Sequence, residues 1–443
     1  MRQNYGVKEN LKMNIVQLCS APPPYGGVTI YGHETSKELV RLGHRVFMLP
    51  LTKAKKIDPD YQREINYEIV YCDKFFNFAT LVDFILFSFR LLRRKDAILH
   101  KSLYRLLISR RSLKSVLGNF YLLSFVYWIC VRNKIDILMG HHASARGMIA
   151  LIVGKMLNIP AFVFVHGGAI FFDENTTSRE KALTKWVLSK AYGLLFCSNN
   201  SISRALELGA DRHKIYHVGL GVDASKYRCK EKRTKSNYYT IGFLGNLFPY
   251  RGLEELIISS FKIVQKIPNL RIILAGPDPL RYWNRLRALI DKVNLGNFVE
   301  YWGEVTQDKH KKFLCQLDVM ALLIKGKKTG SLPSCLEAQS VGVPVLTTGS
   351  GGVDEYILPG KTGFICGQGV NKICNGLLKI YEYYQKDLWD HNLIKEWALD
   401  HSWRKVALNM EKVFKNSKDC SNINVLAKIG KPPRLGNGFH KGI

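Results

Sequence analysis

The sequence predicts an α/β protein with two doubly wound parallel sheets, and three observations lead to this class. The chain has 443 residues, more than one compact core usually holds, so two domains are expected. Apolar residues make up 47% and charged residues 23%, which is ordinary for a globular chain and excludes a disordered or multi-span membrane protein. Short β-branched runs alternate with longer segments of helical period, as in parallel sheets covered by helices.

This alternation occurs twice along the chain. The strands of the first set are predicted at 13–18, 46–49, 135–138, 161–165 and 194–197. The strands of the second set are predicted at 240–244, 271–274, 298–301, 319–322 and 344–347. A polar, basic stretch at 226–238 reads as a linker, so we expect one domain at 13–225 and another at 238–398. Ligands of such sheets bind at the carboxyl ends of the strands, which here face a crevice between the domains.

Two segments depart from the alternation. Residues 74–131 lie between the second and third predicted strands, and from Arg90 to Lys114 they hold nine Lys or Arg residues and one acid, Asp96. Leucines follow at helical spacing, so a helix here has one apolar and one cationic face. Such a helix either lies on a membrane surface or packs on its own domain, and amphipathicity does not separate the two. The tail at 418–443 is expected to be flexible.

The net charge indicates which classes of partner the protein binds, and the cysteine pattern indicates its cellular compartment. Lys and Arg outnumber Asp and Glu by 65 to 36, a formal charge of +29, which indicates nucleic acid, an anionic lipid surface or a phosphorylated ligand. The ten cysteines form no C-x-x-C pair, so buried thiols in a reducing cytosol are expected. No secretory signal and no uninterrupted bilayer-length run is recognisable. A cytoplasmic protein is therefore predicted.

The first domain has two candidate ligand motifs. Gly26 and Gly27 stand between the first strand and a helix, where glycines let backbone amides approach an anion, although a tight turn explains them equally well. His166 follows an apolar strand and precedes two glycines. At that edge of a sheet its imidazole can hydrogen-bond a sugar hydroxyl or a phosphate oxygen.

The second domain adds a cation, a helix start and a carboxylate. Arg251 follows the glycine-ended strand that closes at Gly245, so its guanidinium can hold phosphate oxygens in bidentate fashion, unless it is a solvated surface arginine. The loop at 331–334 leads into a helix whose first turn offers free amides to a diphosphate. Glu337, within that helix among apolar neighbours, is suited to accept two ribose hydroxyls because a buried carboxylate needs a partner.

In this order the motifs resemble those of the retaining glycosyltransferases of the family-four type (glycosyl transferases group 1), over about residues 13–415. Gly245, Arg251 and Gly252 are similar to the family's G-R-x(4)-K-G element, and 337–344 to E-A-x-x-x-G-x-P. The glycine-rich passage at 351–364 resembles its closing signature. The resemblance implies the GT-B fold, in which two Rossmann-like domains face a central crevice, and a carboxyl-terminal helix at 399–417 that packs back on the first domain.

The resemblance also implies an activity: transfer of a sugar, with retention of configuration, from a nucleotide-sugar donor to a lipid-linked or polysaccharide acceptor in cell-envelope glycan synthesis. No metal and no cofactor are expected. His166 and Arg251 are the implied catalytic residues. The implied donor-binding residues are Gly26, Gly27, Gly245, Asn246, Arg251, Thr329, Gly330, Ser331, Leu332, Pro333 and Glu337.

The chain departs from the family pattern at three of these positions. Asn246 stands where the family usually has Arg, Arg251 replaces the usual Lys, and Thr329 replaces the first Glu of the E-x(7)-E motif. Arg251 is therefore the expected principal cation on the diphosphate. Recognition of the donor sugar must differ from the family's, with Lys325, Lys327 or Thr329 as candidates.

The basic insertion adds the expectation of a protein held peripherally at the inner face of the membrane. Two other functions remain open on the same scaffold: a nucleotide-sugar epimerase or hydrolase, and a non-catalytic binding protein. Nucleic acid is not an expected specific partner, because no recognition module accompanies the charge.

Overall fold

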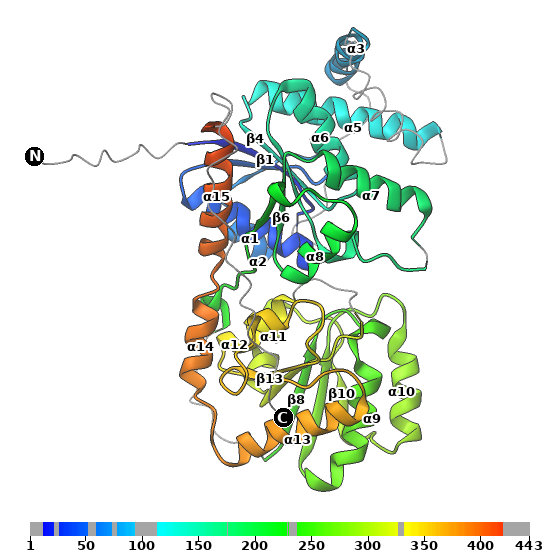
Figure 1. Cartoon of the computed structure of the whole chain (residues 1–443), viewed down its shortest axis with the longest axis vertical. Coiled ribbons are helices and arrows are strands. Elements are labelled where there is room, and N and C mark those ends of the chain that lie inside the picture. Colours follow the sequence, from blue (N-terminus) through cyan, green and yellow to red (C-terminus); the bar gives the residue numbers. More distant parts are fainter. Residues whose placement is uncertain are drawn as a thin grey trace, which may run out of the picture.

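A computed structural model of the chain describes residues 12–21, 26–51, 59–72, 78–93, 113–174, 176–227, 229, 237–326 and 332–419. Its strands form two separate parallel sheets, one in each half of the molecule (Figure 1). The α/β class with two doubly wound sheets is thus confirmed.

The first sheet has the strand order β3-β2-β1-β4-β5-β6-β7 among the described residues. Its strands are β1 (Asn14–Leu18), β2 (Arg45–Met48), β3 (Glu68–Ile69), β4 (Ile137–His141), β5 (Ala161–Phe164), β6 (Gly193–Phe196) and β7 (Ile215–His217). The helices of this half are α1 (Gly27–Arg41), α2 (Pro59–Glu64), α3 (Phe78–Leu92), α5 (Leu113–Arg132), α6 (Ala145–Leu157), α7 (Ser178–Lys190) and α8 (Asn199–Glu207). Ile15 and Val16 are buried in separate apolar clusters, because helices cover both faces of the sheet.

The second sheet has the order β10-β9-β8-β11-β12-β13 in the described part of the chain. Its strands are β8 (Tyr239–Leu244), β9 (Leu270–Ala275), β10 (Val299–Tyr301), β11 (Val319–Leu322), β12 (Val345–Thr347) and β13 (Gly363–Ile365). The helices that follow these strands are α9 (Leu253–Ile263), α10 (Tyr282–Lys292), α11 (Gln307–Cys315), α12 (Pro333–Ser340), α13 (Val370–Gln385) and α14 (His391–Leu399).

All ten predicted strands are present, with ends shifted by at most three residues. Three strands were not predicted: β3, β7 and β13. Each lies at the edge of its sheet and has only two or three residues. An edge strand pairs on one side only, so it needs no long apolar run, and a short polar or glycine-led segment gives little sequence signal.

The carboxyl-terminal helix α15 (Trp403–Asp419) returns to the first sheet and runs along α1 (Figure 1). The Trp403 ring stands edge-on to Tyr31 at 5.0 Å between centroids, and Phe414 packs on Phe162 at 5.1 Å. Glu411 lies 3.1 Å from the buried His44. A helix that follows the second sheet in the chain therefore forms part of the core of the first half.

The basic insertion contains two helices that pack together. Trp128 of α5 donates from Nε1 to the Asp83 backbone oxygen of α3 at 2.7 Å, and Phe87 contacts Phe120. The leucines at 103, 106 and 107 lie outside the described residues. In the part of the chain that the structure covers, no helix combines the length and apolar character that a membrane span requires.

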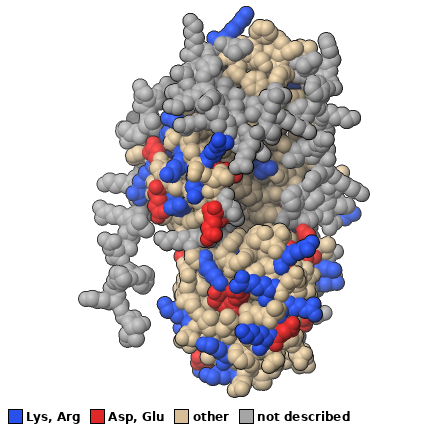
Figure 2. Space-filling view, turned by 90° about the vertical axis from the view of Figure 1, so that its right-hand side faces the viewer, with Lys and Arg blue, Asp and Glu red and all other residues tan. Residues whose placement is uncertain are grey.

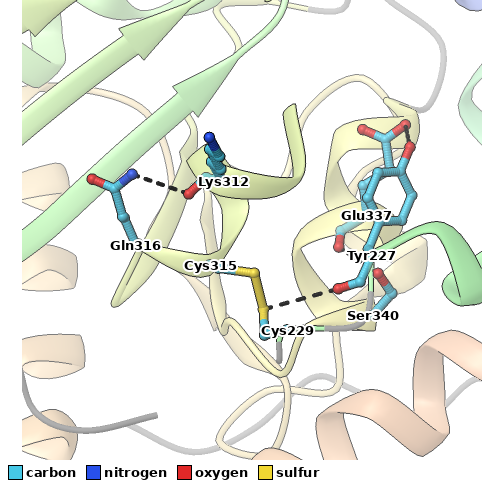
Figure 3. The surroundings of a disulfide bond; sticks show 7 residues. All are labelled: Tyr227, Cys229, Lys312, Cys315, Gln316, Glu337 and Ser340. Carbon is cyan, nitrogen blue, oxygen red and sulfur yellow. Dashed lines mark hydrogen bonds between the residues drawn. A yellow bond between two sulfur atoms is a disulfide. The ribbon is translucent and has the colours of Figure 1, made fainter. Parts of the chain in front are cut away.

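The expectation that all cysteines are thiols was wrong for one pair. Cys229, just after the first half of the chain, is joined to Cys315 at the end of α11 by a disulfide (Figure 3). The two cysteines are 86 residues apart in sequence, so no short spacing motif predicts the bond. Only the tertiary fold brings the two sulfur atoms together. Cys19, Cys130, Cys335 and Cys374 are buried and form no disulfide among the described residues.

The basic excess is spread over the molecule. On the face shown in Figure 2, Lys and Arg side chains lie on both halves, with acidic side chains between them. The visible charge therefore does not gather into a single groove.

Candidate functional site

The predicted site residues that the structure describes lie beyond the carboxyl ends of four parallel strands, in loops or in the helices that follow. In the first sheet, β1 leads toward Gly26 and α1, and β5 leads to His166. In the second, β8 leads to Arg251 and its parallel neighbour β11 leads to α12. The loops after β8 and β11 touch, since the Lys325 amide donates to the Tyr250 carbonyl at 2.9 Å. Thr329, Gly330 and Ser331 lie outside the described residues.

Arg251 brings to the site a guanidinium whose Nε and Nη1 atoms are buried. It ends a short 3-10 helix (Pro249–Arg251), and neither Nε nor Nη1 has a hydrogen-bond partner among the described residues. Its guanidinium lies over the Tyr250 ring, 5.3 Å from the centroid. Burial lowers the pKa of Arg251, yet a guanidinium stays protonated in proteins. The free donors therefore fit an anionic ligand, as the sequence led us to expect.

Gly252 holds Arg251 in place through its backbone. Its φ of +74° is in the left-handed region, and an added Cβ would lie 1.8 Å from the Leu323 carbonyl oxygen. Only glycine allows this close approach between the loop after β8 and the end of β11. The residue next to Arg251 is thus held against the end of β11.

Glu337 lies in α12, where its carboxylate already has two neighbours. Tyr227 donates from its hydroxyl to Oε1 at 3.3 Å, and His310 of α11 brings Nε2 to 3.2 Å from Oε2 (Figure 3 shows Tyr227 and Glu337). The first turn of α12 begins at Pro333 after Leu332, and no side chain caps it. A ribose bound by Glu337 would share the carboxylate with Tyr227 and His310.

The other residues expected near the donor differ in how accessible they are to a ligand. Gly26 caps α1, and a Cβ added at Gly26 or Gly27 would meet nothing within 4 Å, so the start of α1 is open to a ligand. Asn246 is half-buried beside Gly245 in the loop after β8. Lys325, a candidate for sugar recognition, is instead paired with Glu255 of α9 at 2.5 Å.

His166 belongs to a cluster of histidines that was not predicted. His141 at the end of β4 brings Nδ1 to 3.1 Å from Nε2 of His166, and its Nε2 lies 2.8 Å from Oε1 of Gln17. Burial lowers the pKa of His141 to about 3 and that of His142 to about 4. Burial also lowers the pKa of His166 well below its usual value, and the neighbouring His142 adds to this. All three rings are therefore neutral at pH 7.

The signal for this cluster was present in the sequence. His141 and His142 stand three and four residues past the predicted strand at 135–138, close to the kind of position that drew attention to His166. Gln17 gave no such signal, because one polar residue inside an apolar strand is common.

A second polar cluster joins the two halves of the chain. His33, Glu34 and Glu64 have ligand atoms within 4.8 Å of one another, a spacing open to a cation. The ammonium group of Lys226 lies 2.7 Å from both carboxylates, and Lys37 lies 3.1 Å from Glu34. Two lysines thus already balance the two acids. The cluster ties the residue before Tyr227 to the first half, while Tyr227 itself contacts Glu337.

Direct contacts between the halves surround the amino-terminal end of α8. Glu355, in a 3-10 helix of the second half (Asp354–Tyr356), accepts from the Asn199 amide at 2.7 Å and from its Nδ2 at 2.9 Å. Burial raises the pKa of Glu355 to about 7. Tyr356 donates to the Cys197 carbonyl at 2.7 Å. At this place the two halves are therefore joined by hydrogen bonds between polar groups.

Comparison with known proteins gives two family matches that follow one another along the chain. The family described as Glycosyltransferase Family 4 matches residues 25–226, and the family described as Glycosyl transferases group 1 matches residues 227–387. The boundary between the matches falls beside Tyr227, within the predicted linker.

The relatives are distant. One subunit of the phosphatidylinositol N-acetylglucosaminyltransferase of Arabidopsis thaliana is 22% identical over 310 residues, which are 69% of this chain and 68% of that protein. A GDP-mannose-dependent alpha-(1-6)-phosphatidylinositol monomannoside mannosyltransferase of Mycobacterium tuberculosis is 23% identical over 199 residues, which are 42% of this chain and 51% of that protein.

Solved structures match over nearly the whole chain. Sucrose-phosphate synthase from Thermosynechococcus elongatus gives a TM-score of 0.71 at 14% identity and covers 92% of this chain and 100% of its own. Anabaena HepE in complex with UDP and glucose gives 0.67 at 15% identity, covering 91% and 100%. At such identities these structures establish the fold alone. The consecutive family matches, the two parallel sheets and this shared fold identify the chain as a glycosyltransferase of the GT-B fold, belonging to the glycosyl transferases group 1 family.

Proposed function

We propose that this glycosyltransferase moves a sugar from a nucleotide-sugar donor to a lipid-linked or polysaccharide acceptor, with retention of anomeric configuration, in cell-envelope glycan synthesis. The guanidinium of Arg251 carries the proposal: its Nε and Nη1 are buried with no partner among the residues that the structure describes, and a buried cation is costly unless an anion meets it. A diphosphate supplies that anion. Among the relatives, HepE was solved with UDP and glucose, and the mycobacterial enzyme is GDP-mannose-dependent.

In this proposal the second domain, 238–398, holds the donor and the first, 13–225, holds the acceptor. The bond from the anomeric carbon to the diphosphate breaks while the acceptor hydroxyl attacks on the same face, and its proton passes to the departing diphosphate. Arg251 and the amides at the start of α12 stabilise the charge that develops on the leaving group. His166 and the open start of α1 position the reacting groups. Glu337 accepts ribose hydroxyls.

No step of this mechanism needs a metal, and metal independence remains a prediction. It is checked by comparing turnover in EDTA with turnover in Mg²⁺, which should agree within about twofold.

We further propose that the protein works in the cytoplasm at the inner face of the membrane. The support is α3, whose outward side chains Ile85, Leu86 and Phe89 are 45%, 45% and 60% exposed, next to the exposed Arg90 and Arg93. An apolar face flanked by cations suits an anionic lipid surface.

The decisive experiment is a transfer reaction with UDP-, GDP- and ADP-sugars and a lipid extract as acceptor. We expect one donor to give a glycolipid or glycan whose new linkage has the anomeric configuration of the donor, read by NMR. Release of free sugar or an epimerised donor without acceptor would instead favour the hydrolase or epimerase alternative. An inverted product would contradict the retaining mechanism.

A further inference from the structure

Behind His166 lies a chain of three hydrogen-bonding side chains from three neighbouring strands. Gln17 is in β1, His141 ends β4, and His166 follows β5, while β1 pairs with β4 and β4 with β5. Gln17 Oε1 lies 2.8 Å from His141 Nε2, and His141 Nδ1 lies 3.1 Å from His166 Nε2. Gln17 and His141 are 0% exposed and His166 is 9% exposed. The chain therefore runs from the core of the first sheet to its ligand-binding edge.

The chemistry of these groups gives the chain a direction. Gln17 turns its amide oxygen toward the His141 ring, while its own Nε2 is buried without a hydrogen-bond partner among the described residues. In this orientation the oxygen only accepts, so Nε2 of His141 carries the hydrogen. A neutral imidazole has one N–H, so Nδ1 of His141 must accept from the Nε2–H of His166. The proton of His166 is then on Nε2, and its Nδ1 is an acceptor. The His166 ring is hydrogen-bonded to His141 through Nε2, so Nδ1 is the ring acceptor that remains for a ligand.

We propose that Gln17 and His141 are positioning residues that fix the tautomer of His166, so that its Nδ1 receives a hydrogen bond from a substrate hydroxyl. The identity of that hydroxyl as one on the sugar rests on the proposed function; the relay itself does not. A fully ionised phosphate oxygen has no hydrogen to donate, so the relay selects a hydroxyl over the diphosphate as the group bound by His166.

Two further observations agree with this direction. Burial lowers the pKa of His141 and of His166. Each ring therefore keeps a single N–H near pH 7, and the direction of the hydrogen bonds is preserved. Arg146, whose Nη2 donates to Ser20 at 2.7 Å, adds positive charge next to the cluster and opposes a second proton on either ring.

The relay can be tested without any substrate. Protein with ¹⁵N-labelled histidine, assigned with His141→Ala and His166→Ala, reports by NMR which ring nitrogen carries hydrogen. We expect both rings to be protonated on Nε2 in the native protein, and still so in Gln17→Glu, whose carboxylate also accepts. Gln17→Leu, of similar volume, should mix the two tautomers, and Gln17→Met serves if the leucine variant does not fold. A hydrogen on Nδ1 of His166 in the native protein, or unchanged tautomers in the apolar variant, would overturn the relay.

A second experiment measures kcat/KM of the proposed sugar-transfer reaction. Loss of the relay should lower kcat/KM about tenfold in Gln17→Leu, the worth of one hydrogen bond, and Gln17→Glu should restore it to within about threefold. When His166→Ala is already present, adding Gln17→Leu should not lower kcat/KM any further. An equal loss in both backgrounds means a merely structural role and overturns the proposal. If no donor supports transfer, the proposed function fails while the NMR arm still decides the relay.

Discussion

Arg251 is expected to affect both the stability of the folded protein and the binding of an anionic ligand at the site. Its guanidinium is buried against Tyr250, and two of its nitrogens have no partner in the described part of the chain. An unpaired buried charge lowers stability. The folded chain thus retains a destabilising feature where an anionic ligand would remove the cost, a trade between stability and binding that is common at functional sites.

Replacing this charge should therefore stabilise the ligand-free protein. Arg251→Met keeps most of the side-chain volume and removes the unpaired cation, so we expect the free energy of unfolding to rise by about 1 kcal/mol. Thermal denaturation without ligand measures it. Arg271→Met is the matched control, because Arg271 donates to Glu300 at 2.8 and 2.9 Å, and its loss should leave the protein no more stable. A less stable Arg251→Met protein would show that Arg251 is structural.

At this scale, position relative to a strand was the signal from which two candidate site residues could be predicted. Arg251 follows a glycine-ended strand and His166 ends an apolar one, and both were found in that way. Gln17 and the partners of Glu337 were not, since Tyr227 and His310 reach that carboxylate from distant parts of the chain. Such contacts depend on packing that no local pattern encodes.

At the scale of elements, α3 has two different faces. Phe87 is buried against Phe120 of α5, whereas Ile85 and Phe89 point away from it and are exposed. Figure 1 shows α3 beside α5 at the outer end of the first half, away from the second sheet. The exposed apolar face of α3 precedes the leucines predicted to form an amphipathic helix, and the leucines at 103, 106 and 107 lie outside the described residues.

This geometry predicts where membrane contact is made. The double variant Ile85→Ser/Phe89→Ser should lose at least about tenfold in affinity for vesicles of anionic lipid, because each buried side chain contributes about 1.5–3 kcal/mol. Vesicle co-sedimentation measures it. The control is Leu280→Ser, another exposed apolar residue, in the second half. Equal binding by the double variant and the native protein would refute the role of α3.

At the scale of the whole molecule, the two halves meet through a titratable contact. Glu355 accepts three hydrogen bonds at the start of α8, from Asn199 and Asn200, and desolvation nevertheless raises its pKa to about 7. Between the ordinary carboxyl pKa and about pH 7, the folded protein holds a proton that the unfolded chain has lost. Stability contributed by this group therefore falls as pH rises through that window.

Two substitutions test this dependence. Glu355→Gln stays neutral and should remove the fall in Tm from about pH 5 to pH 7 that belongs to Glu355. Asn199→Ala removes a donor to the ionised carboxylate and should move the fall to higher pH. Thermal denaturation across this pH range measures both. An unchanged pH profile in Glu355→Gln would mean that the carboxyl does not titrate there.

The overall fold was accessible from sequence because buried parallel strands are long apolar runs, as in β1 and β5. The disulfide between Cys229 and Cys315 was not, since 86 residues separate its ends. The contacts that join the halves were also missed: Asn199 and Glu355 are polar and carry no periodic signal. Their pairing exists only once both sheets have formed.

Binding of nucleotides to the native protein and to Arg251→Met tests the central claim most directly. One of UDP, GDP or ADP, at 100 times its dissociation constant, should stabilise the native protein by about 2.7 kcal/mol and leave Arg251→Met almost unshifted at the same concentration. Equal stabilisation of both proteins, or of neither by any nucleotide, would contradict the account of Arg251 as the cation that meets the diphosphate.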